Sequence, residues 1–559
     1  MDAPAFDRYL QYDELTALLK NLEREFDTAS LESIGKSHEG REIWAMTITG
    51  AGEPRDKPGF LVDGNIHGSE VTASMAALHF AWTVLSKYGD DETITRLVDT
   101  TALYVIPMIS PDGVEHVLSG VGWVRSGTRM YPREEARSGL HIEDVDGNGQ
   151  ILSMRMVDPG GGWKVSSSDP RLLVPRRFHD HGGTYFRVFP EGLIHDFDGV
   201  EVGVAPPKQG LDFNRNFGAN WQPESQQSGA GEYPMSEPET RALAAFVTAH
   251  PNLCGAHSLH TGMESIIRPP STQTDKQMPP EDLRRIWEIG RLGVEETGYV
   301  LFSDYTLNDD VYAIHGDFGC WCYEFRGLVA YTVELWDLRA RSGRDYLALS
   351  EMNKQRDLDG LEQVELALLT WNDDELGGEG FFDWHPFDHP QLGPVEIGGW
   401  RRLLRNNAPE SMLADTCAME TRFLIAHAQA SPQLRVSVHE VESIAEGVFR
   451  IAIDVHNDGY FPTHVTEQAL KQKQVTDVEA RIELDGAGTI VSGQEIEYLG
   501  QLAGFGGGPW RGDGVSERQR RKVEWVVRLE GRPQGTIEVR SQRAGTVRLA
   551  LADVIEVRT

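Results

Sequence analysis

The amino-acid sequence predicts a large α/β domain followed by a small all-β domain. Over the earlier part of the 559 residues, short apolar runs alternate with amphipathic helical runs. This alternation is typical of a mixed, mostly parallel central sheet flanked by helices. After residue 433, short strand-like runs are separated by turns, which is the pattern of a β-sandwich. A hydrophobic fraction of 40% supplies apolar material for both cores and excludes a disordered chain.

The elements of the α/β domain follow from hydrophobic periodicity. Leucines at helical spacing predict a first helix over 13–26. Near-continuous apolar runs predict buried strands over 42–48, 60–63, 103–109, 253–260 and 330–336. Amphipathic runs between them predict helices over 70–87, 236–250, 281–297 and 349–371. The S-x-x-E pattern from Ser236 to Glu239 predicts a capping box at the start of its helix.

Changes in composition predict three segments. Residues 1–375 form the α/β domain, which a Gly-, Pro- and Asp-rich insertion with expected hairpins interrupts at about 137–208. Residues 376–432 are expected to be a connector, extended over 376–405 and helical over 408–431. Residues 433–559 form the sandwich, expected to be an accessory module that stabilises the protein or mediates oligomerisation. Glycan or protein binding is the alternative role for this module.

Charge and composition exclude several classes of function. The 53 Lys and Arg against 86 Asp and Glu give a net charge of −33, which repels phosphate and argues against nucleic-acid binding. No apolar run is long enough to span a membrane. The amino-terminal residues do not resemble a secretory signal, and the four cysteines do not resemble a disulfide framework. A cytoplasmic location is therefore expected.

His67 and Glu70 lie where a predicted strand turns into a predicted helix. In an open α/β sheet this edge is where ligands bind, and an imidazole and a carboxylate three residues apart can bind one zinc ion. A catalytic zinc site needs a third ligand, and both His257 and His260 on a later strand are candidates. Taken alone, H-x-x-E is more often a surface histidine beside a capping glutamate.

Two loops and one strand contain further candidate residues. Asn214 and Arg215 are adjacent in a short loop, and Arg125 lies in another, where a guanidinium can bind both oxygens of a carboxylate. Taken singly, each loop is more often a surface loop with a solvated arginine. Glu334 is the acid of an otherwise apolar strand. Beside a metal it would be a general base, and elsewhere it would be half of a buried ion pair.

Taken in order, these motifs resemble the zinc carboxypeptidase A family of metallocarboxypeptidases over about residues 10–370. The similar segments are 33–43, 64–70, 110–113, 123–125 and 212–216. The number of residues between the third ligand and Pro269 matches the family when that ligand is His260 and not His257. The spacings from Tyr312 to Trp321 and from Trp321 to Glu334 are those of the family. Tyr312 would then be the mobile active-site tyrosine of the family.

The resemblance implies a role for each matched residue. One Zn²⁺ would be held by three ligands, His67, Glu70 and His260, with Asp212 hydrogen-bonded to His67. Glu334 would be the general base towards a zinc-activated water, and Arg125 would stabilise the oxyanion. The terminal carboxylate of the substrate would be bound by Asn214 and Arg215, with Tyr312 closing over it.

The resemblance thus implies hydrolysis of the C-terminal peptide bond of peptides with a free carboxylate. One alternative is an amide hydrolase of the same chemistry that acts on a murein peptide, an isopeptide or an N-acyl amino acid. A non-catalytic binding protein on this scaffold is the other alternative. Family members that prefer a basic final residue carry an acid at the position that is Gly319 here. Because Asp317 is close by, the sequence leaves open whether the preferred final residue of the substrate is apolar or basic.

The insertion contains a loop that resembles the first half of an EF-hand calcium site. Asp144, Asp146 and Asn148 occupy the ligand positions, but the twelfth position is Arg155 instead of glutamate. A Ca²⁺ site completed by another acid, such as Asp158, is one interpretation. A loop rich in Asx turns with no ion is the other.

Overall fold

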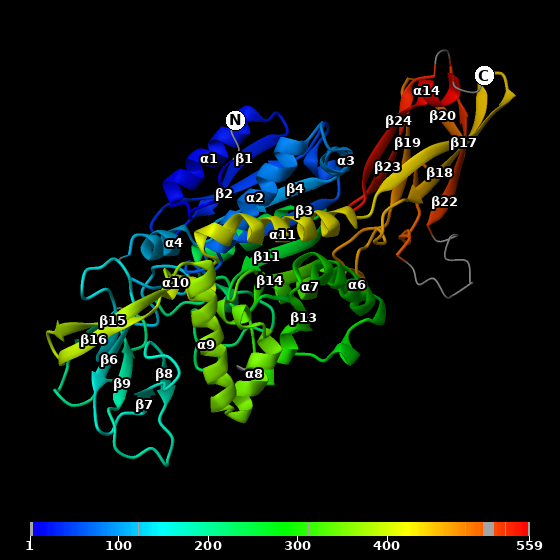
Figure 1. Ribbon diagram of the computed structural model, residues 1–559. Coiled ribbons are helices and arrows are strands. Elements are labelled where there is room, and N and C mark those ends of the chain that lie inside the picture. The colour runs from blue at the N-terminus through cyan, green and yellow to red at the C-terminus, as the bar shows by residue number, and fades with distance from the viewer. Residues whose placement is uncertain are drawn as a thin grey trace.

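The computed structural model describes residues 4–120, 122–133, 135–309, 313–486, 488–506, 519–530 and 533–556. An α/β core lies in the middle of an elongated molecule, with a small β layer at one end and a β-sandwich at the other (Figure 1). The predicted fold class is confirmed. Within the described ranges, no helix has the length and apolar character needed to cross a membrane.

The central sheet is mixed, with its parallel strands in the middle. Its order among the described residues is β1 (Ala29–Lys36), β2 (Glu42–Ile48), β4 (Ala102–Ile106), β3 (Gly59–Gly64), β11 (Leu253–His260), β14 (Val329–Glu334), β12 (Ser265–Arg268) and β13 (Val300–Ser303). β4, β3, β11 and β14 run parallel to one another. These four strands are buried on both faces, as their continuous apolar runs predict.

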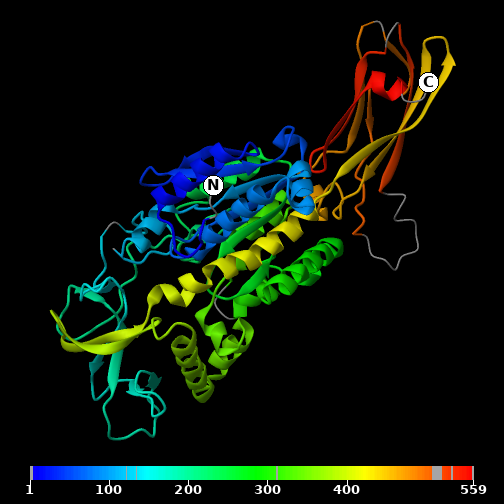
Figure 2. The ribbon, with the colours of Figure 1, turned by 45° about the horizontal axis from the view of Figure 1, so that its top comes forward.

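Helices cover both faces of this sheet. One face is covered by α2 (Thr72–Lys87), α6 (Pro280–Thr297) and α11 (Glu410–Gln429), and the other by α5 (Pro238–Ala249) and α7 (Phe318–Arg326). The remaining helices near the core are α1 (Tyr12–Glu25), α3 (Glu92–Thr100), α4 (Pro111–Leu118), α8 (Tyr346–Gln355), α9 (Leu358–Glu375) and α10 (Arg402–Asn406). α11 lies between α2 and α6 (Figure 2), so the helix predicted within the connector belongs to the core.

The β layer combines the insertion with a distant hairpin. Its larger sheet contains β15 (Phe381–His389), β16 (Gly393–Trp400), β6 (Ser153–Val157), β9 (Phe186–Pro190), β7 (Trp163–Val165) and β8 (Leu173–Pro175), in that order. Beside it, β5 (Gly139–Ile142) pairs with β10 (Gly192–His195). The expected extended connector over 376–405 is therefore wrong, because apolar residues of the hairpin such as Ile397 pack into the insertion.

Two local predictions are also wrong. α5 begins at Pro238 with Glu237 as its N-cap, so Ser236 and Glu239 do not occupy the capping-box positions, and the Glu239 carboxylate instead accepts a hydrogen bond from the His38 backbone at 2.8 Å. The single helix expected over 349–371 is two helices, α8 and α9. They separate at Arg356, whose φ of 52° is left-handed and ends a helix.

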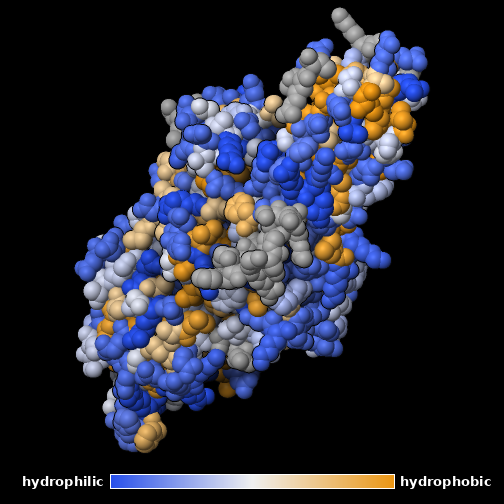
Figure 3. Space-filling view, turned by 90° about the vertical axis from the view of Figure 1, so that its right-hand side faces the viewer, coloured by the Kyte–Doolittle hydropathy of each residue, from blue (hydrophilic) through white to orange (hydrophobic). Residues whose placement is uncertain are grey.

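The predicted sandwich consists of two four-stranded antiparallel sheets among the described residues. One sheet contains β17 (Leu434–Ala445), β18 (Val448–Asn457), β22 (Arg520–Arg528) and β20 (Thr489–Ser492). The other contains β21 (Ile496–Tyr498), β19 (Glu479–Leu484), β23 (Gly535–Ser541) and β24 (Gly545–Ala550). The short helix α14 (Leu551–Glu556) packs on these sheets, whereas α12 (Glu467–Lys471) packs on α6 and α7 of the core. Trp525 and Ile482 pack in the core between the sheets. Most of the face in Figure 3 is hydrophilic, with hydrophobic residues gathered at its top, over the sandwich.

Candidate metal centre and substrate site

Three side chains meet at the carboxyl ends of β3 and β11. His67 Nδ1 lies 2.9 Å from Glu70 Oε1, and His260 Nδ1 lies 3.0 Å from both Glu70 Oε2 and His67 Nδ1. All three side chains are 1–2% exposed, and one ligand atom from each lies within 4.8 Å of the others. The geometry therefore brings together the three residues that the sequence suggested as ligands.

The surroundings of Glu70 favour its ionised form, and those of His260 favour its neutral form. Burial by itself would raise the pKa of Glu70, but His67 and the Arg125 guanidinium hold the pKa of this carboxyl well below its usual range. Burial lowers the pKa of His260 and so favours a neutral ring with a free lone pair. A carboxylate and a neutral imidazole are the forms that bind a divalent cation.

Asp212 and Arg125 surround the outer side of His67. Asp212 Oδ1 lies 3.0 Å from His67 Nε2, which directs the opposite nitrogen, Nδ1, towards the centre of the site. Arg125 donates to Glu70 Oε1 at 2.5 Å and to Asp212 Oδ2 at 3.3 Å. Burial opposes ionisation of Asp212, yet the charges of His67, Arg215 and Arg125 keep its pKa well below the usual range.

His260 is oriented by two residues that the sequence reasoning missed. Ser258 Oγ lies 3.2 Å from His260 Nε2 and donates to Asp63 Oδ1 at 2.9 Å. Burial raises the pKa of Asp63 to about 8. The available signal was an acid near the end of the apolar strand β3, opposite Ser258 on β11 in the register. His257, the rejected third ligand, lies within hydrogen-bond distance of Glu420 and His427 in the core.

Glu334 is the neighbour of His260 on the adjacent strand. The two residues are paired in the register of β11 and β14, and Glu334 Oε2 is buried without a hydrogen-bond partner among the described residues. Burial and then the charge of Glu70 raise the pKa of Glu334 well above its usual range. Gly262 has a φ of 136°, and a Cβ there would lie 3.6 Å from Glu334 Oε2. Glycine thus keeps space open in front of this carboxylate.

Asn214 and Arg215 form a short 3₁₀ turn over Phe213–Arg215, whose N-cap is Asp212. Asp212 therefore connects His67 to this turn, because its Oδ1 accepts from the Asn214 backbone at 2.9 Å and also lies 3.0 Å from His67 Nε2. Arg215 is 9% exposed and donates to the Asn214 carbonyl at 2.9 Å. The turn places a buried guanidinium next to the metal ligands.

Two buried acids lie close to Arg215. Asp304 and Asp317 form a cluster with Cys320, in which Asp317 Oδ1 accepts from the Cys320 backbone at 2.7 Å and Asp304 Oδ2 lies 3.5 Å from the sulfur. Burial raises the pKa of both carboxyls, and Arg215 partly opposes the rise. Asp317 Oδ2 has no hydrogen-bond partner within the described ranges. Tyr312 lies outside the described residues.

The calcium-like loop in the insertion has a different set of acids from the one expected. Asp144 and Asp146 lie with Glu191, not with Asp158, in a group whose ligand atoms are within 4.8 Å of one another. Glu191 already accepts from the backbones of Val145 and Leu152 at 2.7 and 2.8 Å. Asn148 donates to Asp146 and is not in the group, and Arg155 pairs with Glu396. Calcium binding stays a prediction.

Comparisons with known proteins match two parts of the chain to two different families. The zinc carboxypeptidase family matches residues 15–349, and a domain of unknown function matches residues 433–552. Metallocarboxypeptidase A of Trichophyton tonsurans is 38% identical over 216 residues, which are 38% of this chain and 48% of that protein. Carboxypeptidase M of Mus musculus is 30% identical over 129 residues, 22% of this chain and 29% of that protein. The chain thus spans about half the length, or less, of these relatives.

Among solved structures, carboxypeptidase A from Helicoverpa armigera has a TM-score of 0.41 and 17% identity, covering 65% of this chain and 74% of that one. A murein-tripeptide amidase from Escherichia coli O157 has a TM-score of 0.26 and 15% identity, covering 55% and 82%.

Proposed function

Since the chain belongs to the zinc carboxypeptidase family, we propose that it is a metallocarboxypeptidase that removes the last residue of peptides with a free C-terminal carboxylate. The observation that carries this proposal is the convergence of His67, Glu70 and His260 beside Glu334. The adjoining Asn214–Arg215 turn gives the site a group that suits a carboxylate.

The donor set fits zinc. Two imidazole nitrogens face each other at 3.0 Å across one carboxylate, and three N and O donors with an open side are the pattern of catalytic zinc. Asp212 and Ser258 orient the rings from outside, as metal-binding histidines require. When bound, zinc supplies a Lewis acid that polarises a carbonyl and lowers the pKa of water to about 7.

Glu334 is proposed to move the proton. Its unpartnered Oε2 accepts a proton from the attacking water and passes it to the nitrogen of the leaving amino acid. Burial raises the pKa of this carboxyl and so increases its affinity for a proton. Without this group the water keeps its proton and the amine leaves as an unfavourable anion.

Arg125 is proposed to stabilise the oxyanion. Its side chain is 43% exposed and already lies at Glu70, so its guanidinium borders the site and can donate to the charge that develops on the scissile carbonyl oxygen. Its contacts with Glu70 and Asp212 hold the guanidinium in place before the substrate arrives.

The turn of Asn214 and Arg215 is proposed to bind the carboxylate of the final residue, since a guanidinium and an amide donor complement its two oxygens. Asp304 and Asp317 favour a basic final residue. A cation would offset the cost of the unpartnered Asp317 oxygen, whereas an apolar side chain would not.

The test is hydrolysis of matched peptides, free and amidated, ending in Lys, Arg, Phe or Leu, followed by mass spectrometry. Loss of single C-terminal residues, abolished by amidation and by a chelator and restored by zinc, is expected. Glu334→Gln should lose this activity. Its control is Glu239→Gln, which changes a buried glutamate of α5 outside the site and should retain activity.

Two outcomes contradict the proposal. Cleavage of amidated and free peptides alike would mean that no carboxylate is recognised and would favour the alternative amide hydrolase. Equal activity of Glu334→Gln and the parent would exclude the proposed proton transfer.

A further inference from the structure

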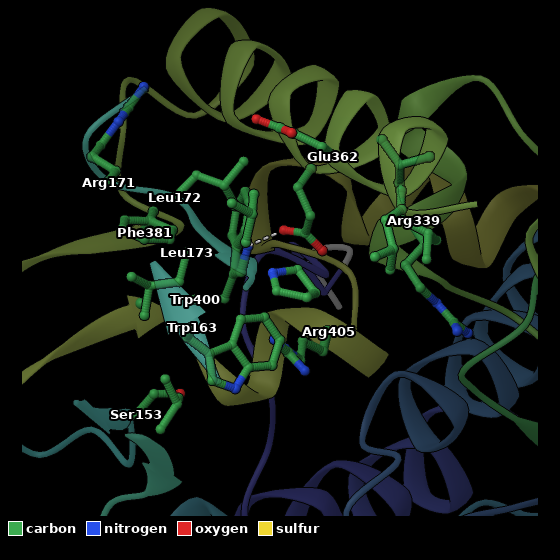
Figure 4. A pocket seen from close by; sticks show the side chains of 18 of the residues that line it. Ser153, Trp163, Arg171, Leu172, Leu173, Arg339, Glu362, Phe381, Trp400 and Arg405 are labelled. Atoms are coloured by element: carbon green, nitrogen blue, oxygen red, sulfur yellow. Dashed lines mark hydrogen bonds between the residues drawn. The ribbon is translucent and has the colours of Figure 1, made fainter. Parts of the chain in front are cut away.

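A large cavity lies between the β layer and the helices α8 and α9, which follow the strand β14 that ends at Glu334. Its volume is about 420 Å³, and its walls come from the insertion, from the β15–β16 hairpin and from α8 and α9. In Figure 4, Leu172, Leu173 and Phe381 lie on one side of the cavity and Arg339 lies on the other. The cavity therefore exists only because the insertion meets a distant part of the chain, formed by α8, α9 and the hairpin that follows them.

The lining is chemically apolar. Aromatic and aliphatic side chains provide most of it, namely Trp163, Trp384, Trp400, Leu172, Leu358 and Leu361. The charged groups are mostly bonded to the protein. Glu365 accepts from the Trp400 indole at 3.0 Å (dashed line in Figure 4), and Arg339 pairs with Asp337 at 2.9 Å. The surface left for a ligand thus suits an apolar group and not a charged one.

This cavity continues towards the proposed catalytic glutamate. A second cavity of about 330 Å³ shares four residues with the first, Arg339, Glu365, Trp400 and Arg405. Its far end is lined by Gly262 and Asn406. A Cβ at Gly262 would lie 3.6 Å from Glu334 Oε2 and 3.8 Å from Asn406 Nδ2. The path from Glu334 into the apolar cavity therefore passes over a residue without a side chain.

The position of this path tells which part of a substrate can enter it. The residue after the scissile bond is assigned to Asn214 and Arg215, and neither lines either cavity. The second cavity instead reaches Glu334 at Gly262. Residues before the scissile bond are thus the part of a peptide that can extend along this path.

We propose that the two cavities bind the substrate on the amino-terminal side of the scissile bond, and that the larger one holds a bulky apolar side chain, aromatic or branched. The proposal rests on the proposed carboxypeptidase function. Arg405, which has no ion-pair partner among the described residues, lies where the cavities join and donates to the peptide backbone there. The enzyme thus selects peptides by an upstream residue as well as by the last one.

The experiment compares peptides that share a C-terminal dipeptide and carry Phe, Leu, Gly or Glu at each of the three preceding positions. At one of these positions kcat/KM is expected to be about tenfold higher for Phe or Leu than for Gly, the usual gain from filling an apolar pocket. Glu should be no better than Gly. Equal kcat/KM at all three positions would overturn the proposal.

Leu361→Trp tests the cavity itself. Leu361 is half-buried on α9 and lines the larger cavity, so an indole there occupies the volume that the ligand needs. The Phe-to-Gly ratio should fall to about one. The control is Leu347→Trp, the same change at an exposed leucine of α8 that does not line the cavity, and it should keep the parent ratio. An unchanged ratio in Leu361→Trp would overturn the proposal.

Calorimetry separates this proposal from the proposed function. If no peptide is hydrolysed, the carboxypeptidase assignment fails, and binding of the same peptides is measured directly. Saturable binding of the Phe peptide that Leu361→Trp weakens about tenfold would still support the apolar site. Equal binding of the Phe and Gly peptides would overturn it.

Discussion

The β layer and the C-terminal sandwich are both additions to the α/β core, but they are built and attached in opposite ways. The layer needs two segments that lie far apart in the sequence, since β16 pairs with β6 across more than two hundred residues of chain. The sandwich is continuous and closes its own hydrophobic core. The layer borders the path to Glu334, whereas the sandwich lies at the far end of the molecule (Figure 1).

The attachments differ in the same way. The layer contributes apolar cavity walls next to the site. The sandwich region docks through apolar residues such as Phe461 and Val465, which join the core cluster, and through buried polar contacts. One of these polar contacts is Arg543, 1% exposed and bonded to the carbonyls of Gly327, His464 and Arg326. Under the proposed function the layer would therefore shape the substrate site, whereas the sandwich is attached at the far end of the molecule.

The largest expected effect is a loss of activity on changing a residue of the core, which belongs to neither the β layer nor the sandwich. His260→Ala removes one of the three converging donors and should lower kcat/KM by more than about 100-fold, because even outer-sphere changes around a metal cost 10–100-fold. Zinc content should fall in parallel. Ser258→Ala, which removes only the group beside His260 Nε2, should cost about tenfold. Full activity of His260→Ala would place the site elsewhere.

The next effect concerns how the sandwich is held. Arg543→Ala removes hydrogen bonds that a buried, charged guanidinium donates to backbone carbonyls and should lower the free energy of unfolding by about 3 kcal/mol, measured by urea denaturation. The kcat/KM of the folded variant should stay that of the parent. The control is Arg548→Ala, whose exposed pair with Asp56 should contribute less than about 1 kcal/mol. Loss of activity without loss of stability would break the comparison.

Ile397→Ala tests the layer. Ile397 is fully buried where the hairpin packs on the insertion, so the change should cost about 2 kcal/mol in unfolding free energy. It should also reduce the Phe-to-Gly ratio of kcat/KM, an effect that Arg543→Ala should lack. Identical ratios in the two variants would remove the distinction between the layer and the sandwich.

The last effect is a pH dependence of stability that belongs to the core alone. Burial raises the pKa of Glu239 to about 7, whereas a glutamate in the unfolded chain titrates near 4.3. As the pH rises from about 4.3 to 7, the unfolded state releases a proton that the folded state keeps, so this group's contribution to stability is lost across that window.

Glu239→Gln removes this contribution. The unfolding free energy of the parent minus that of the variant should therefore fall between pH 5 and pH 8, as measured by urea denaturation at both pH values. Glu25→Gln, an exposed glutamate of α1, is the control and should give a difference that does not change with pH. Parallel pH profiles for Glu239→Gln and the parent would contradict the raised pKa.

Much of the core and of the metal centre was predictable from local sequence. β11 has the predicted limits of 253–260, and β3 ends within one residue of the prediction, because a continuous apolar run reports burial on both faces. His67 and Glu70 were predictable because they share one turn. Arg356 shows the opposite case: a left-handed residue that ends α8 has no signal in the helical periodicity around it.

The sequence by itself determined the order of the strands and helices, the residue types of the metal site and the sandwich pattern, because each depends on neighbours within a few turns of chain. Only the tertiary structure decided that Ser258 and Asp63 orient His260, that α11 covers the core, and that the 381–400 hairpin completes the β layer. The physical reason is that these contacts join residues far apart in the chain. Local periodicity reports which side of an element is buried, but it does not report the partner against which that side packs.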